Sequence, residues 1–359
     1  MRGTEGREDG RTGRDRSVVP SFRRSVRAGV LGVLALAACA EPGPAPAAPV
    51  ERVRIPPGAT VAAVAESLEA HGVITDRLRF RITARVRRLD RALQAGVYDF
   101  RRGERAADVL AALAEGRTAA QRFTVPEGIT LAELADLAAE RIGVPAESVA
   151  AAARRLATSD AFHDAGPTLE GFLLPETYTL PVEVTADQLV RAMTDGFLRA
   201  WRPEWTARLD TLGMTRRDAV TLASIVEGEA RVEAERATIA GVYHNRLRRG
   251  MPLQADPTVQ YAIQLATGKR KPRLFLKDYR TASPYNTYLR PGLPPGPISS
   301  PGIASIEAVL HPADVPWLYF VARGDGSHEF SATYRDHVNA INRIRRGGSG
   351  ERGAVSGER

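Results

Sequence analysis

The stretch FTVPEGITLAELADLA, residues 123–138, sets the fold class of the chain. A short β-type run leads through a proline to Gly128, which permits a sharp turn. Thr130 can then cap a helix by accepting from an unpaired backbone N–H, and Glu133, three residues later, completes a capping box. Apolar residues follow at helical spacing. The stretch therefore predicts a strand–turn–helix unit.

The same pattern recurs twice closer to the N-terminus. VRIPPGATVAAVAESL, residues 53–68, repeats it closely, and YDFRRGERAADVLAAL, residues 98–113, repeats it faintly. Such units resemble LysM modules, which bind N-acetylated glycan chains, although a packing domain without a binding role explains them equally well. We expect an α+β protein, with a small LysM-like βα-repeat domain over residues 51–144 and a larger mixed α+β domain over residues 145–345. Residues 346–359 are expected to be a disordered tail.

The composition is that of a globular protein with a basic balance. With 359 residues, the chain is long enough for two domains with cores of their own. The formal net charge of +8 suggests an acidic partner. However, the positive charge is nearly all arginine and is scattered, with lysine only at Lys269, Lys271 and Lys277. Nucleic-acid binding is therefore not expected.

The N-terminal segment has the features of a secretion signal. Arginines over residues 23–27 precede the apolar run AGVLGVLALAA, which is shorter than the about 20 residues that a spanning helix needs. The following LAAC, ending at the single cysteine Cys39, resembles a bacterial lipobox. We expect residues 1–38 to be a lipoprotein-type signal peptide, Cys39 to be lipidated, and the Pro/Ala-rich residues 39–50 to be an extended linker. An uncleaved signal anchor is the alternative. Either would hold the protein on a bacterial membrane, facing the periplasm.

A further stretch, TLASIVEGEA, places Glu227 directly behind an apolar run. Residues 214–250 are too long for one ordinary helix, so we predict two helices with a break near Gly228. Glu227 would then lie in the last turn of the first helix, where the helix dipole and apolar neighbours favour the protonated form that a general acid needs. The alternative is that these acids are simply solvated. The carboxylates that we consider with less support are Glu229, Glu235 and Glu176.

Two later segments carry polar and aromatic residues suited to sugar binding. GMPLQADPTVQYA contributes Gln254 and Asp256, although turn chemistry and helix capping also explain them. TASPYNTYLRPGLPPGPISSPG is a long loop with Tyr285 and Asn286, whose ring and amide suit stacking on sugars and bonding to acetamido groups. A structural wrap is the alternative for this loop. Further on, WLYFVA and HEFSAT flank an Asp-Gly turn and predict a hairpin.

Motifs for metals, cofactors and nucleophilic catalysis do not occur in the sequence. HExxH, CxxC, a Walker loop and G-x-S-x-G are all missing. We therefore expect neither a metal nor a cofactor, and any enzymatic chemistry must depend on carboxylates.

Taken together, the motifs resemble one family. EGFLLPETY, LASIVEGEA, ERATIAGVYHNRL, GMPLQADPTVQY, SPYNTYLRPGLPPGPISSPG and LYFVARGDGSHEFSAT occur in this order. They are similar to the endolytic murein lytic transglycosylases, the YceG-like or MltG family, from about Glu51 to Asn342. The resemblance implies that residues 145–345 are catalytic and cut nascent peptidoglycan strands at the MurNAc–GlcNAc bond, leaving 1,6-anhydro-MurNAc ends. The glutamate that closes the family's ASIVE motif is Glu227 here.

The resemblance also implies a catalytic role for Glu227. Glu227 would act first as general acid and then as general base. We expect Gln254, Asp256, Tyr285 and Asn286 to hold the glycan or to orient Glu227. One rival is a muramidase-type hydrolase that pairs Glu227 with a second acid such as Asp256. Another is a non-catalytic peptidoglycan-binding lipoprotein. Family members usually have an N-terminal transmembrane helix rather than a lipobox, and contact with cell-wall synthesis enzymes is implied by the resemblance alone.

Overall fold

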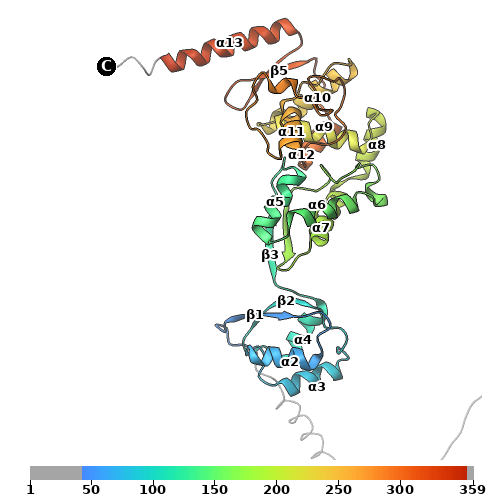
Figure 1. Ribbon diagram of the computed structural model, residues 1–359, viewed down its shortest axis with the longest axis vertical. Coiled ribbons are helices and arrows are strands. Elements are labelled where there is room, and N and C mark those ends of the chain that lie inside the picture. The colour runs from blue at the N-terminus through green and yellow to red at the C-terminus, as the bar shows by residue number, and fades with distance from the viewer. Residues whose placement is uncertain (1–42, 354–359) are drawn as a thin grey trace, which may run out of the picture. The chain divides into compact units, whose positions relative to one another are not determined.

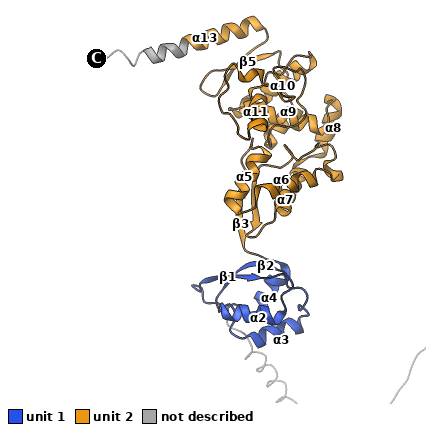
Figure 2. Ribbon diagram, viewed as in Figure 1, with its two compact units in different colours: residues 1–117 blue, residues 118–359 orange. Residues whose placement is uncertain are grey.

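The computed structural model describes residues 43–353, with side chains over residues 43–346. The chain divides into two compact units after Arg117 (Figure 2). Each unit has a hydrophobic core of its own. The elements of unit 1 are β1 (Val50–Ile55), α2 (Val61–Ala70), α3 (Arg77–Val86), β2 (Gly96–Arg101) and α4 (Ala106–Glu115) (Figure 1).

Unit 1 is a two-stranded antiparallel sheet packed with three helices. β1 and β2 pair with Val53 opposite Tyr98, and both side chains are buried. Leu68 of α2 and Phe80 of α3 complete the same core. As the repeat predicts, Thr60 caps α2, because its Oγ1 accepts from the backbone N–H of Ala63 at 3.2 Å.

Unit 2 begins at Thr118 and contains most of the helices. Its elements are β3 (Ala120–Thr124), α5 (Leu131–Ile142), α6 (Ala146–Leu156), the 3-10 helix η1 (Asp160–Phe162), β4 (Thr177–Pro181), α7 (Ala186–Ala200), α8 (Pro203–Leu212), α9 (Arg216–Glu229), η2 (Glu233–Glu235), α10 (Arg236–Arg248), α11 (Asp256–Thr267), η3 (Asp278–Arg280), α12 (Ile303–Leu310), β5 (Tyr319–Ala322), β6 (His328–Ser331) and α13 (Tyr334–Gly353). β3 pairs with β4, and β5 with β6, both antiparallel. Helix and sheet are mixed, in agreement with the expected α+β class.

The three copies of the strand–turn–helix repeat form as predicted, but the boundary between the two compact units differs from the expected one. Gly58, Gly103 and Gly128 all adopt positive φ between their strand and helix. The structure divides after Arg117, whereas the sequence suggested a boundary after residue 144. The cause is long-range pairing: β3 pairs with β4, and α5 packs on α6, so residues 123–138 belong to unit 2.

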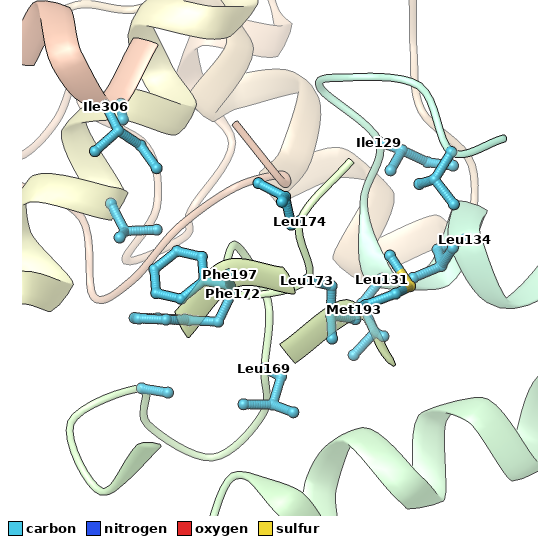
Figure 3. Packing of buried hydrophobic residues seen from close by; sticks show 14 of the residues in the cluster. Ile129, Leu131, Leu134, Leu169, Phe172, Leu173, Leu174, Met193, Phe197 and Ile306 are labelled. Carbon is cyan, nitrogen blue, oxygen red and sulfur yellow. The ribbon is translucent and has the colours of Figure 1, made fainter. Parts of the chain in front are cut away.

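The core of unit 2 joins segments that are far apart in the sequence (Figure 3). Phe172 and Phe197 lie side by side with their ring centroids 5.2 Å apart. Leu131 and Leu134 of α5 belong to the same cluster, and so does Ile306 of α12. The site described below is therefore built on a continuous packed core.

Three local expectations can be compared with the structure. The helix break near Gly228 is confirmed, since α9 ends at Glu229 and α10 begins at Arg236. The hairpin is confirmed as β5 and β6. The expected disordered tail over residues 346–359 is wrong for its first part, because α13 continues to Gly353. This helix starts from a turn in which Thr333 and Asp336 hydrogen-bond to each other, and a helix that has nucleated extends at little further cost.

The expectations for the N-terminus fall mainly outside the described residues. The signal peptide over residues 1–38 and the lipidation of Cys39 lie wholly outside them, as does the start of the linker over residues 39–50. The linker's described end leads directly into β1 at Val50. Among the described helices, none combines the length and the apolar character needed to cross a bilayer.

Candidate active site

Helix α9 carries the candidate acids at its C-terminal end. Its start is fixed by a capping box, in which Thr215 Oγ1 and Asp218 satisfy each other's backbone N–H groups. The helix is buried continuously from Ala219 to Val226. Glu227 and Glu229 follow in the last turn, and because residues two apart in a helix face different directions, they enter separate surroundings.

Glu227 is held by three donors, one at the start of α10 and two at the start of α12. Its Oε2 accepts from Arg236 Nη1 at 3.1 Å, from Ser305 Oγ at 2.8 Å and from the backbone N–H of Gly302 at 3.0 Å. The side chain is only 9% exposed. Gly302 is the N-cap of α12, so the positive end of that helix dipole also faces the carboxylate. Among the described residues, Oε1 has no hydrogen-bond partner and is available to a ligand.

Glu227 lines a cavity of about 470 Å³. The other residues around this cavity, the Glu227 cavity, are Gly128, Gly228, Ala230, Arg231, Gln260, Arg270 and Pro272. Gly128 packs against the acid: a Cβ there would lie 3.7 Å from Glu227 Cγ. The turn between β3 and α5 therefore forms one wall directly against the candidate catalytic side chain.

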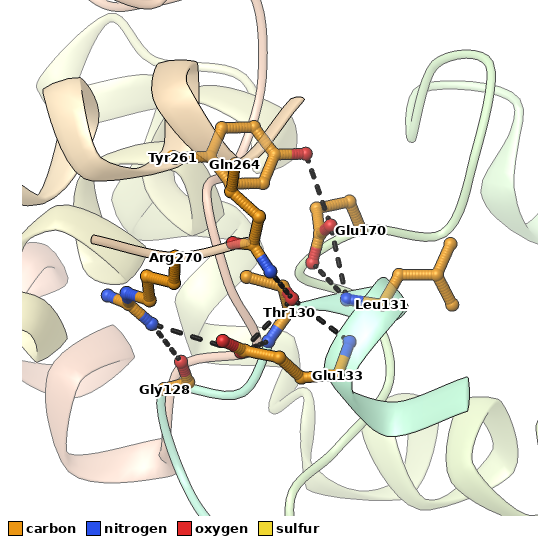
Figure 4. Close-up of polar contacts among 8 residues, drawn as sticks. All are labelled: Gly128, Thr130, Leu131, Glu133, Glu170, Tyr261, Gln264 and Arg270. Carbon is orange, nitrogen blue, oxygen red and sulfur yellow. Dashed lines mark hydrogen bonds and ion pairs between the residues drawn. The ribbon is translucent and has the colours of Figure 1, made fainter. Parts of the chain in front are cut away.

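A buried hydrogen-bond network holds that turn in place (Figure 4). Arg270 Nη1 donates to the carbonyl of Gly128 at 3.2 Å. Gln264 Nε2 of α11 donates to Thr130 Oγ1 at 3.0 Å. Glu170 accepts from the backbone N–H of Leu131 at 3.0 Å and from the Tyr261 hydroxyl at 3.1 Å.

Glu170 belongs to the EGFLLPETY motif and is buried in this network. Burial raises its pKa from 4.5 to about 7, against the lowering effect of its hydrogen bonds to Leu131 and Tyr261. The Glu170 carboxyl group links α5 to α11, because it accepts from the first N–H of α5 and from a tyrosine of α11. We interpret Glu170 as a positioning residue for the turn that contains Gly128.

Glu127 is a second carboxyl beside Glu227, and no sequence motif singled it out. Burial raises the pKa of Glu127, and the charge of Glu227 raises it further. A Cβ on Gly302, whose N–H donates to Glu227, would lie 1.9 Å from Glu127 Oε1. Both carboxyls thus lie close to the same glycine. The sequence signal was present in VPEG, the turn of the repeat, but only the fold shows its neighbour.

Glu229 faces a different cavity, of about 360 Å³. This cavity, the Glu229 cavity, is also lined by Tyr243, Arg246, Leu253, Gln254, Asp256, Tyr288, Phe320, Ala322, His328 and His337. Burial raises the pKa of Glu229 to about 7, and the negative charge of Asp256 adds to the effect. Asp256 accepts from the Tyr288 hydroxyl at 2.6 Å and from the Tyr279 hydroxyl at 3.3 Å. The structure therefore brings the predicted residues Gln254 and Asp256 together with Glu229.

The remaining predicted residues have structural partners. Asn286 is fully buried: its amide donates to the carbonyls of Tyr279 and Thr281, and its Oδ1 accepts from the N–H of Tyr288. The side chain therefore fixes the loop and is not presented to a ligand. Tyr285 packs edge-on against Tyr261, with ring centroids 5.0 Å apart.

Glu235 and Glu176, the other two weaker candidates, also lie outside the Glu227 cavity. Glu235 of η2 accepts from the backbone N–H of His328 at 3.0 Å and contacts its ring Nδ1 at 2.8 Å, which joins η2 to the hairpin. Glu176 is exposed and lines a shallow hollow with Glu127 and Arg199. Within residues 43–353, no group of three or more His, Cys, Asp or Glu side chains is arranged to hold a metal ion.

The family model described as YceG-like matches residues 53–343. The chain belongs to the YceG-like family. This confirms the resemblance found in the motifs. The YceG-like match covers unit 2 up to α13 and nearly all described elements of unit 1.

Two curated relatives of this chain carry the name endolytic murein transglycosylase. The endolytic murein transglycosylase of Bacillus subtilis (strain 168) is 33% identical over 307 residues, which cover 80% of this chain and 83% of the relative. That of Streptococcus pneumoniae serotype 2 is 30% identical over 317 residues, covering 79% of this chain and 56% of the relative. A solved yceG-like protein of Listeria monocytogenes superposes with a TM-score of 0.55 at 30% identity, over 82% of this chain and all of that one.

Proposed function

We propose that this protein is an endolytic murein transglycosylase, a peptidoglycan lyase. The relatives carry this name, and the family membership supports its transfer to this chain. The bond that we propose is cleaved lies between MurNAc and GlcNAc of nascent glycan strands, and the product carries a 1,6-anhydro-MurNAc end. Such cuts would terminate or trim strands.

Glu227 is the proposed acid and base. The observation that carries this assignment is its geometry: Oε2 takes all three hydrogen bonds, which leaves Oε1 for the substrate at the wall of a cavity. In the first half of the reaction Glu227 protonates the glycosidic oxygen and the leaving sugar departs. Its carboxylate then removes the proton of the C6 hydroxyl, whose oxygen attacks the anomeric carbon. Arg236, the N–H of Gly302 and Ser305 stabilise the carboxylate between the two steps.

The rival hydrolase needs a second carboxyl at a suitable distance. Asp256 lines the Glu229 cavity and is held by two tyrosine hydroxyls, whereas Glu127 lies beside Glu227. Glu127 is therefore the second acid to examine. Gln254 and Asp256 remain proposed glycan contacts, in the Glu229 cavity.

Unit 1 and the N-terminus have proposed roles of their own. The order β1–α2–α3–β2 supports a LysM-like module that holds glycan chains. Lipidation of Cys39 would anchor the protein at the periplasmic side of a membrane, in the cell envelope. Contact with cell-wall synthesis enzymes rests on the family resemblance.

The test is mass spectrometry of purified peptidoglycan digested with residues 43–359. The variants are Glu227→Gln and, as a control, Glu204→Gln, which changes an exposed acid at the start of α8. New 1,6-anhydro ends with wild type and the control, but not with Glu227→Gln, would support the proposal. Reducing ends that depend on Glu227 would establish the hydrolase, and Glu127→Gln would then test its second acid. Binding of the polymer without any cleavage would favour the non-catalytic rival.

A further inference from the structure

Helix α3 of unit 1 carries an apolar stripe on its exposed side. Leu78, Ile82 and Val86 are 60%, 55% and 77% exposed. Because residues four apart lie on one face of a helix, the stripe runs the length of α3. The inward side of the helix is already used, since Phe80 and Ala84 are fully buried in the core of unit 1. The stripe is thus a second apolar surface, beyond what folding of unit 1 requires.

A row of arginines runs beside the stripe. Three exposed arginines have the same four-residue spacing, and each directly precedes one residue of the stripe: Arg77, Arg81 and Arg85. Arg77 makes an exposed ion pair with Glu69 at 3.6 Å. Among the described residues, Arg81 and Arg85 have no ion-pair partner. The helix therefore presents a cationic row and an apolar row together.

The helix is formed before any partner binds. Asp76 caps α3, because its Oδ1 accepts from the backbone N–H groups of Leu78 at 2.8 Å and Arg79 at 3.0 Å. A preformed helix binds without the cost of ordering a chain. The two rows are consequently held at a fixed angle to each other.

We propose that α3 docks unit 1 on a membrane surface that contains anionic lipid. Arginine side chains pair with lipid phosphates, and apolar side chains beside them enter the boundary between headgroups and acyl chains. Glycan strands lack such an apolar layer for Leu78, Ile82 and Val86, which favours lipid over polymer as the occupant of this face. The inference is independent of the proposed transglycosylase activity.

The position of α3 in the chain is compatible with this contact. A lipid anchor at Cys39, as proposed above, would keep β1 within about 40 Å of the bilayer, because an extended residue spans at most about 3.3–3.6 Å. Docking through α3 would then replace a loose tether by an oriented contact.

The test uses residues 43–359, which contain both hydrophobic cores and no cysteine, since Cys39 is the only one. Ile82→Cys is labelled with an environment-sensitive nitrobenzoxadiazole dye. Leu265→Cys, at a leucine of α11 that is 58% exposed, is the matched control. Each is mixed with phosphatidylcholine vesicles, with or without phosphatidylglycerol. We expect a blue shift and stronger emission for Ile82→Cys only, mainly with phosphatidylglycerol and reversed by salt.

Arginine variants measure the electrostatic part separately. Replacing Arg81 and Arg85 by Gln should weaken vesicle binding about fivefold for each arginine. No response of Ile82→Cys to phosphatidylglycerol vesicles, or an equal response of Leu265→Cys, would overturn the proposal. A blue shift that grows with protein concentration in the absence of lipid would also overturn it, because the stripe would then be covered by a second copy of the chain.

Discussion

Glu170 should give the folded protein a measurable pH dependence of stability. The carboxyl is 9% exposed, and burial raises its pKa from 4.5 to about 7. Between these two values the folded protein keeps a proton that the unfolded chain has released. The contribution to stability is therefore fully present below about pH 4.5 and is lost as the pH rises through about 7. A pKa difference of about 2.5 corresponds to about 3 kcal/mol.

The perturbation is Glu170→Gln, which keeps an oxygen acceptor for the N–H of Leu131 but cannot ionise. Urea unfolding of both proteins is measured at about pH 4.5, 6 and 8. We expect the free energy of unfolding of the variant, relative to that of wild type, to rise by about 3 kcal/mol from the lowest to the highest pH. Glu229→Gln should show a change of the same sign, because burial also raises the pKa of Glu229 to about 7. A difference between wild type and Glu170→Gln that stays constant with pH would refute the reasoning.

Three further predictions concern other parts of unit 2. A double-mutant cycle of Arg236→Met and Glu227→Gln should give a coupling energy of about 3 kcal/mol in urea unfolding, because the ion pair is buried. A coupling energy below about 1 kcal/mol would instead indicate a pair that solvent screens. Gly241→Ala should lower the free energy of unfolding by about 1–3 kcal/mol, because the new Cβ would lie 2.5 Å from the carbonyl oxygen of Ala313. This loss is expected although alanine has the better helix propensity. An unchanged denaturation midpoint would contradict the prediction. Asn286→Ala should cost about 2–4 kcal/mol, because the buried backbone groups around the amide lose their partners, and a loss of glycan affinity at unchanged stability would instead make it a ligand contact.

Local features of the fold could be predicted because their causes are local. Glycine turns and threonine caps are encoded within a few residues, so the strand–turn–helix units and the break near Gly228 were visible in the sequence. The boundary between the units was not, since it depends on β3 pairing with β4, whose partners Gln121 and Leu180 lie far apart in the sequence.

The candidate site shows the same contrast. The motif singled out Glu227, but nothing in the sequence placed Glu127 or Ser305 next to it, because those contacts depend on tertiary packing. Asn286 shows the opposite limit. An amide in an aromatic-rich loop suggests sugar binding, yet in the folded chain it holds the loop's own backbone.

The donors around Glu227 also have a consequence for how the protein matures. They come from residues 9, 75 and 78 positions further along the chain. A growing polypeptide that stops before Gly302 can complete α9 but cannot complete the surroundings of Glu227. Long-range contacts of this kind form late, since a large loop must close first. The hydrogen bonds around the Glu227 carboxylate are consequently complete only when the chain has folded as far as α12.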